Sequence, residues 1–231
     1  MSPCLERIFQ EGMDEAGETW GRISALASLS GHIELDHLLA RLESMPDCES
    51  AWNGVAQVFT ANLHIPEHKA NCYSGLLKIL DMQQDRLPHS ILLRISKCFW
   101  SKMEMDGGRE LKNIDSQILN ELLHKILTLF ELVRLDNFDI PQYLSGLSQI
   151  DPMEALKLAF LLGKKAKARV DMGLSGNSRY LIMTLKAIFA FAETEPNQSM
   201  ELIDRAIALQ DLFLELNIYG MDDFLDKAAR N

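Results

Sequence analysis

Hydrophobic and polar residues in this 231-residue chain alternate mostly with the 3.6-residue period of the α-helix. Apolar side chains recur at i, i+3, i+4 and i+7 from Tyr73 to Leu80, and again from Ile91 to Phe99. Each run predicts an amphipathic helix with one buried face. No stretch alternates between apolar and polar residues long enough to indicate a half-buried strand. The pattern therefore predicts an all-α protein.

The segment from Asp115 to Arg134 has more apolar residues than one helical face can hold. We expect it to be a central helix with neighbours on two sides.

Helix starts are predicted from capping residues. Asp151-Pro152-Met153-Glu154 places an acidic N-cap before a first-turn proline, and Glu154 stands where its side chain could reach back to the cap amide. Pro66, Pro88 and Pro196 also occupy positions that a first turn tolerates. Glycine and other turn residues mark the connections between these segments.

These segments predict about eleven helices, most of them in hairpins that begin near residues 14, 48, 88, 139 and 177. The starts lie roughly 34 to 51 residues apart, which brackets the repeat lengths of helical-repeat proteins of the HEAT and tetratricopeptide types. The residue signatures of those repeats are missing. We expect an irregular α-solenoid of helical hairpins or a compact multi-helix bundle. Residues 1–231 would form a single helical domain, with one candidate subdivision near 106–114.

Charge and cysteine usage narrow the function. The net charge is −10, and both ends are acidic: residues 1–50 have ten acidic and three basic side chains. Nucleic-acid binding depends largely on lysine and arginine, so nucleic acid is not an expected partner. The four cysteines lie far apart, which favours a reducing compartment. We expect a cytoplasmic protein without a membrane span, although export by a dedicated secretion system would leave the same pattern.

The sharpest candidate motif is His64-Ile65-Pro66-Glu67-His68, which matches the H-x-x-E-H pattern of a class of zinc peptidases. That motif needs both histidines on one face of a continuous helix, and a proline between them disrupts such a helix. We therefore expect this segment to straddle a helix start and to bind no metal. Cys72 and Cys98 fall near apolar stripes and are expected to be buried small hydrophobes.

The helix predicted from Pro152 to about Val170 carries the candidate binding residues. Its small residues share one arc suited to close helix packing, and its start is expected to be more buried than its end. The cations Lys157, Lys164, Lys165, Lys167 and Arg169 occur with no acidic residue between Ala155 and Val170. They could complement the helix dipole, or they could form a landing site for an acidic segment or a phosphate group.

We expect a non-enzymatic helical interaction module, such as an adaptor, regulatory or sensor-like subunit, that binds another protein and needs no cofactor. One alternative is an acidic inhibitor or immunity protein that blocks a basic enzyme, using acidic residues between Glu34 and Glu49. A second alternative is a metal-dependent hydrolase that uses His64 and His68.

Overall fold

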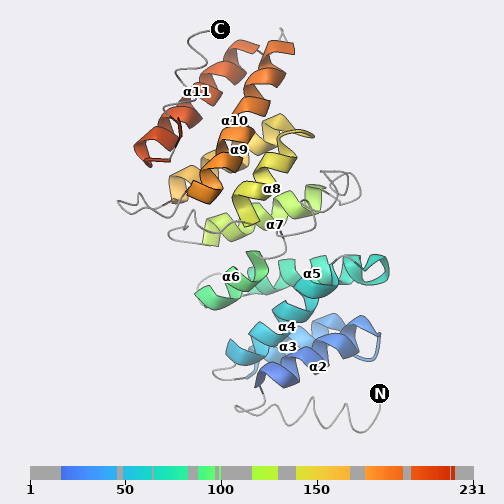
Figure 1. Cartoon of the computed structure of the whole chain (residues 1–231). Helices are drawn as coiled ribbons and strands as arrows, with labels where there is room; N and C mark the ends of the chain where they lie inside the picture. Colours follow the sequence, from blue (N-terminus) through green and yellow to red (C-terminus); the bar gives the residue numbers. More distant parts are fainter. Residues whose placement is uncertain are drawn as a thin grey trace. The chain divides into compact units, whose positions relative to one another are not determined.

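The computed structural model is almost entirely helical (Figure 1). It describes residues 17–45, 49–63, 65–82, 88–96, 99, 116–129, 139–166, 175–194, 199–218 and 220–221. Of these described residues 87% are helical, and none lies in a strand. The all-α prediction is confirmed, and the choice between a solenoid and a bundle stays a prediction.

The chain divides into two compact units, residues 1–98 and residues 99–231. Unit 1 contains α2 (Gly17–Leu29), α3 (Leu35–Glu43), α4 (Glu49–Asn62), α5 (Pro66–Met82) and α6 (His89–Ser96). Unit 2 contains α7 (Ser116–Leu129), α8 (Asp139–Leu147), α9 (Pro152–Lys165), α10 (Ser175–Thr194) and α11 (Ser199–Glu215). The subdivision expected near 106–114 lies outside the described residues, and the single domain stays a prediction.

The helices α2, α4, α6, α8 and α10 begin at residues 17, 49, 89, 139 and 175, each within three residues of an expected hairpin start, and the hairpins themselves stay a prediction. Each unit brings helices together that are second neighbours in the chain. In unit 1, α4 packs against α2 and α6; in unit 2, α9 packs against α7 and α11, and α8 packs against α10. The helices α4 and α9 therefore each bury apolar side chains against neighbouring helices on more than one side.

Unit 1 is organised around the crossing of α2 and α4, where glycines allow the two backbones to approach closely. A Cβ atom added at Gly21 would lie 2.2 Å from the carbonyl oxygen of Ala51. A Cβ atom added at Gly54 would lie 2.2 Å from the carbonyl oxygen of Glu18. No side chain fits in either place, so the crossing distance depends on glycine at both positions.

Cys72 on α5 is fully buried in unit 1, as predicted. Burial raises the pKa of this thiol to about 12, because the thiolate would lose its hydration in apolar surroundings. The side chain is therefore a small hydrophobe rather than a nucleophile at neutral pH. Cys98, for which burial was also predicted, lies outside the described residues.

Two helices end in the same hydrogen-bonding arrangement. At the end of α2, Gly31 has a positive φ of 73°, the His32 amide donates to the Ala27 carbonyl, and the Gly31 amide donates to the Ser28 carbonyl. This is the Schellman motif. At the end of α11, Asn217 (φ 53°) takes the place of glycine, and the Ile218 amide donates to the Phe213 carbonyl.

The small-residue arc predicted for α9 is buried. Ala155, Ala159 and Gly163 lie on this arc, and a Cβ atom added at Gly163 would lie 2.5 Å from Cδ2 of Leu212 on α11. The predicted end of this helix near Val170 was wrong, because α9 ends at Lys165 and Ala166 is extended. A longer helix would place Lys167 and Arg169 within one turn of Lys164 and Lys165, and like charges at that spacing repel.

Candidate functional site

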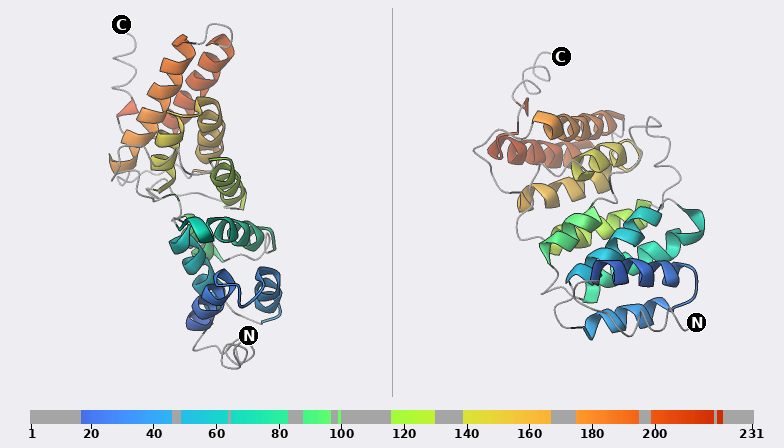
Figure 2. Two further views of the ribbon diagram at one scale, coloured as in Figure 1. Left: turned by 90° about the vertical axis from the view of Figure 1, so that its right-hand side faces the viewer. Right: turned by 60° about the horizontal axis from the view of Figure 1, so that its bottom comes forward.

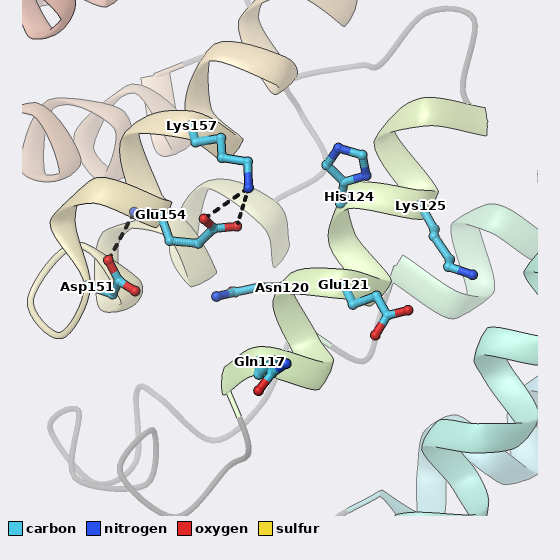
Figure 3. Close-up of a pocket in the computed structure, with 8 residues that line it drawn as sticks. All are labelled: Gln117, Asn120, Glu121, His124, Lys125, Asp151, Glu154 and Lys157. Carbon is cyan, nitrogen blue, oxygen red and sulfur yellow. Dashed lines mark hydrogen bonds and ion pairs between the residues drawn. The ribbon is translucent and has the colours of Figure 1, made fainter.

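An open groove of about 690 Å³ lies along α7 and the start of α9 in unit 2 (Figure 3). The amino-terminal halves of the two helices lie side by side there. The groove is lined by polar and charged side chains: Gln117, Asn120, Glu121, His124, Lys125, Asp151, Glu154 and Lys157. Five of these residues belong to α7 and two to α9, and Asp151 is the N-cap of α9, so the groove is formed by a single helix pair.

On α7 the lining residues occupy the polar face of an amphipathic helix. Positions 117, 120, 121 and 124 follow the i, i+3, i+4, i+7 spacing of one face, whereas Leu119, Leu123 and Ile126 are buried on the other. Within unit 2 the main neighbour of α7 is α9. Gln117, Glu121 and His124 leave one face of α7 exposed to solvent, and the predicted central position with neighbours on two sides stays a prediction.

On α9 the groove begins at the helix cap. The Asp151 carboxylate accepts a hydrogen bond of 3.0 Å from the Glu154 amide, which confirms the predicted N-cap. The second half of the expected capping box was wrong. The Asp151 amide donates to the Leu147 carbonyl at 2.7 Å, so it is already bonded to the end of α8. The Glu154 carboxylate instead pairs with Lys157 at 3.2 Å.

Residues 148–151 form the elbow between α8 and α9, and all four of their amides donate to carbonyls of α8. These bonds fix the direction in which α9 leaves α8, and with it the position of Asp151 at the mouth of the groove.

Asn120 connects the groove to the core of unit 2. Its side-chain oxygen accepts a hydrogen bond of 2.6 Å from the Tyr143 hydroxyl on α8. The Tyr143 ring is buried and packs on the Phe99 ring with centroids 5.0 Å apart. This contact fixes the amide group of Asn120, so its nitrogen is presented to the groove in one orientation.

The groove offers hydrogen-bonding groups but no described metal site. Glu121 and His124 are three residues apart, a spacing that binds metals in some helical bundles when other carboxylates join it. Figure 3 shows the Glu121 side chain turned away from Glu154. Among the residues that the structure describes, no group of three histidine, cysteine or acidic side chains could hold a metal ion.

The structure describes three of the five predicted cationic binding residues, and each has a different environment. Lys157 is paired with Glu154, and the ammonium group of Lys165 lies 3.5 Å from the Thr128 carbonyl at the end of α7. Lys164 is exposed. It shares a face of α9 with Lys157, because residues seven apart nearly eclipse one another on a helix. Lys167 and Arg169 lie outside the described residues.

The H-x-x-E-H segment straddles a helix start, as predicted. Pro66 is the first residue of α5, and His68 is half-buried in the first turn. His64 lies outside the described residues, so the structure gives no geometry for the pair.

The acidic residues of the inhibitor hypothesis are partly engaged within unit 1. Asp36 forms an ion pair with Lys78, and Glu49 accepts a hydrogen bond from Ser90. Glu34 precedes the first turn of α3, and Glu43 is exposed near its end. Asp47 lies outside the described residues.

Sequence reasoning missed the outer face of α11. There an apolar row runs along the helix: Met200, Ile203, Ile207 and Leu214. Met200 is 81% exposed and Ile207 is 44% exposed, while Ile203 and Leu214 are half-buried. An acidic row of exposed side chains lies directly beside it: Asp204, Asp211 and Glu215. The seven-residue recurrence of Met200, Ile207 and Leu214 is the signal in the sequence that could have identified this face.

No family model, curated protein or solved structure matches the chain. No helix within the described part of the chain is long and apolar enough to cross a membrane.

Proposed function

We propose that this protein is a non-enzymatic helical interaction module, an adaptor or regulatory subunit that binds another protein through α11. The apolar row of α11 is the observation that carries the proposal. Exposed large hydrophobic side chains that line up on one face cost solvation free energy, and they mark binding surfaces more often than singly scattered ones do.

Unit 2 supports this location. Five of the seven exposed large hydrophobic side chains among the described residues belong to it, namely Ile150, Met153, Met183, Met200 and Ile207. Both views of Figure 2 show α10 and α11 side by side, so Met183 and the apolar row of α11 belong to one helical hairpin. Methionine suits such a surface because its flexible side chain adapts to different partners.

We place the complex in a reducing, cytoplasmic setting. Cys72 is a free thiol buried in the core of unit 1. A free buried thiol is compatible with a reducing compartment.

The test is capture of partners by the full chain carrying an affinity tag, followed by mass spectrometry. The variant Ile207→Asn changes the apolar row, and Leu93→Asn is the matched control, because Leu93 is 41% exposed on α6 of unit 1. We expect a protein captured by the wild type and by Leu93→Asn to be lost by Ile207→Asn. Equal capture by all three chains would contradict the proposed surface.

The basic end of α9 is a second candidate location for partner binding, and Lys164 is its exposed cation. Changing Lys164, Lys165, Lys167 and Arg169 together to glutamine should leave the helix content unchanged. If these residues form a landing site, the same change weakens partner capture at low salt. Lys186→Gln, an exposed cation on α10, is the control. Unchanged capture would contradict the landing site. Lys164 and Lys165 would then only stabilise α9, by lying at the negative end of its helix dipole.

A further inference from the structure

The apolar row and the acidic row of α11 form two parallel stripes on one helix. Residues seven apart differ by about 20° around a helix, so Met200 and Ile207 nearly eclipse each other, as do Asp204 and Asp211. At 100° per residue, Asp204 and Asp211 are displaced by roughly 40° from Met200 and Ile207, so these two pairs lie next to each other on the exposed face. The basic residue Arg205 lies on the opposite edge of the exposed face, away from both rows.

We propose that these two stripes bind a basic amphipathic helix of the partner protein. This inference rests on the proposed function and specifies the chemistry of the partner. The apolar side of the partner helix covers Met200 and Ile207. Its lysine and arginine side chains extend past that contact and reach Asp204 and Asp211.

The dimensions of the surface favour a helix as the occupant. The apolar row extends from Met200 to Leu214, which is about 21 Å along the helix axis. A partner helix with apolar residues at i, i+3, i+4 and i+7 presents a stripe of matching width, and such helices commonly bind in this manner. An extended strand would instead need an exposed sheet edge, and the described residues contain no strand.

Charge complementarity determines that the partner helix is positively charged. The three carboxylates of the acidic row are exposed, and none of them has an ion-pair partner among the described residues. An acidic or phosphorylated helix would bring like charges against them in a protein of net charge −10. Long basic side chains can bury their methylene groups on the apolar row while their charged ends stay hydrated near the carboxylates.

The probe is a labelled synthetic peptide of about 18 residues, long enough to span the row, with leucines on one helical face and lysines beside them. Its binding to the full chain is measured by fluorescence anisotropy at about 50 mM and about 300 mM salt. A peptide of the same composition in scrambled order removes the apolar stripe, and a peptide with glutamate in place of lysine reverses the charge. We expect only the ordered basic peptide to bind, and to bind more weakly at the higher salt.

Two matched variants locate the site. Asp204→Asn with Asp211→Asn removes two charges from the acidic row. Glu43→Gln with Glu67→Gln removes two exposed charges from α3 and α5 of unit 1, outside α11. We expect the first pair to weaken peptide binding by about fivefold at low salt and the second pair to change it by less than about twofold. Ile207→Asn should weaken binding at both salt concentrations, because the apolar contact is not screened.

Equal binding of the ordered and scrambled peptides would overturn this inference, since it would show general charge attraction. Equal loss of affinity in both variant pairs, or no binding of the basic peptide at all, would also overturn it. The proposed function would still stand in each case if Ile207→Asn loses a captured protein that Leu93→Asn retains. The two claims therefore fail on different measurements.

Discussion

The close crossing of α2 and α4 predicts that the substitution Gly54→Ala destabilises unit 1. The added Cβ atom would lie 2.2 Å from the Glu18 carbonyl oxygen and 3.0 Å from the Arg22 amide nitrogen. Ordinary contact between heavy atoms begins at about 3.5 Å, so the two helices would have to separate by roughly 1 Å. Backbone atoms cannot rotate out of the way as a side chain can.

Two opposing effects set the magnitude. Overpacking of a close interface costs about 1 to 3 kcal/mol, and the upper end applies here because the clash is with backbone. Alanine is favoured over glycine inside a helix by about 1 kcal/mol. The clash is the larger effect. We therefore expect the free energy of unfolding of unit 1 to fall by about 2 kcal/mol.

Urea unfolding followed by tryptophan fluorescence measures this effect, because Trp20 and Trp52 are both buried in unit 1. The control is Gly17→Ala on α2, at the same crossing. There the added Cβ atom meets Oγ of Ser50, the end of a half-buried side chain that can change rotamer. We expect a net change within about 1 kcal/mol in the control. A Gly54→Ala protein as stable as the wild type would refute the reasoning that the backbones are in contact.

Three further predictions concern single residues. Asn217→Gly should raise the free energy of unfolding by several tenths of a kcal/mol in chemical denaturation, and Asn217→Ala should lower it, because glycine adopts a positive φ most easily. Asp151→Ala should cost about 1 kcal/mol in the same assay, whereas Asp151→Asn retains an accepting oxygen and should cost much less. Cys72 has a folded-state pKa raised to about 12, so it should stay unmodified by iodoacetamide at pH 8 until the chain unfolds. Its contribution to stability should be complete below the unfolded pKa near 9 and decline as the pH rises toward 12, an effect that a Cys72→Ala protein should lack.

Local chemistry explains which parts of the fold were predictable. Asp151 and Pro66 mark helix starts through interactions with residues at most one turn away, and both were located correctly. The end of α9 was placed too late because the first glycine or proline after Lys165 is Gly173, eight residues on, so no such residue marks a stop at Lys165. Repulsion among neighbouring lysines is weaker evidence than a cap, and helical periodicity alone does not reveal it.

Contacts between distant segments explain what was missed. The approach of Gly21 to Ala51 and of Gly54 to Glu18 joins residues of two helices, and neither glycine differs in sequence context from an ordinary turn residue. The groove likewise combines Asn120 from α7 with Asp151 from the start of α9. The apolar row of α11 was visible as a seven-residue recurrence. Only the burial pattern shows that the α11 row faces solvent and that similar rows on other helices face the core.

The elbow at residues 148–151 has a consequence for synthesis of the chain on the ribosome. Its amides bond only to carbonyls of α8, and the Asp151 carboxylate bonds only one turn ahead, to Glu154. Nothing after Glu154 is needed to set these bonds, so the start of α9 can be aligned before α10 and α11 have emerged. Such short-range contacts form quickly because little chain entropy is lost in closing them. When α10 and α11 emerge, the direction in which α9 leaves α8 is therefore already set.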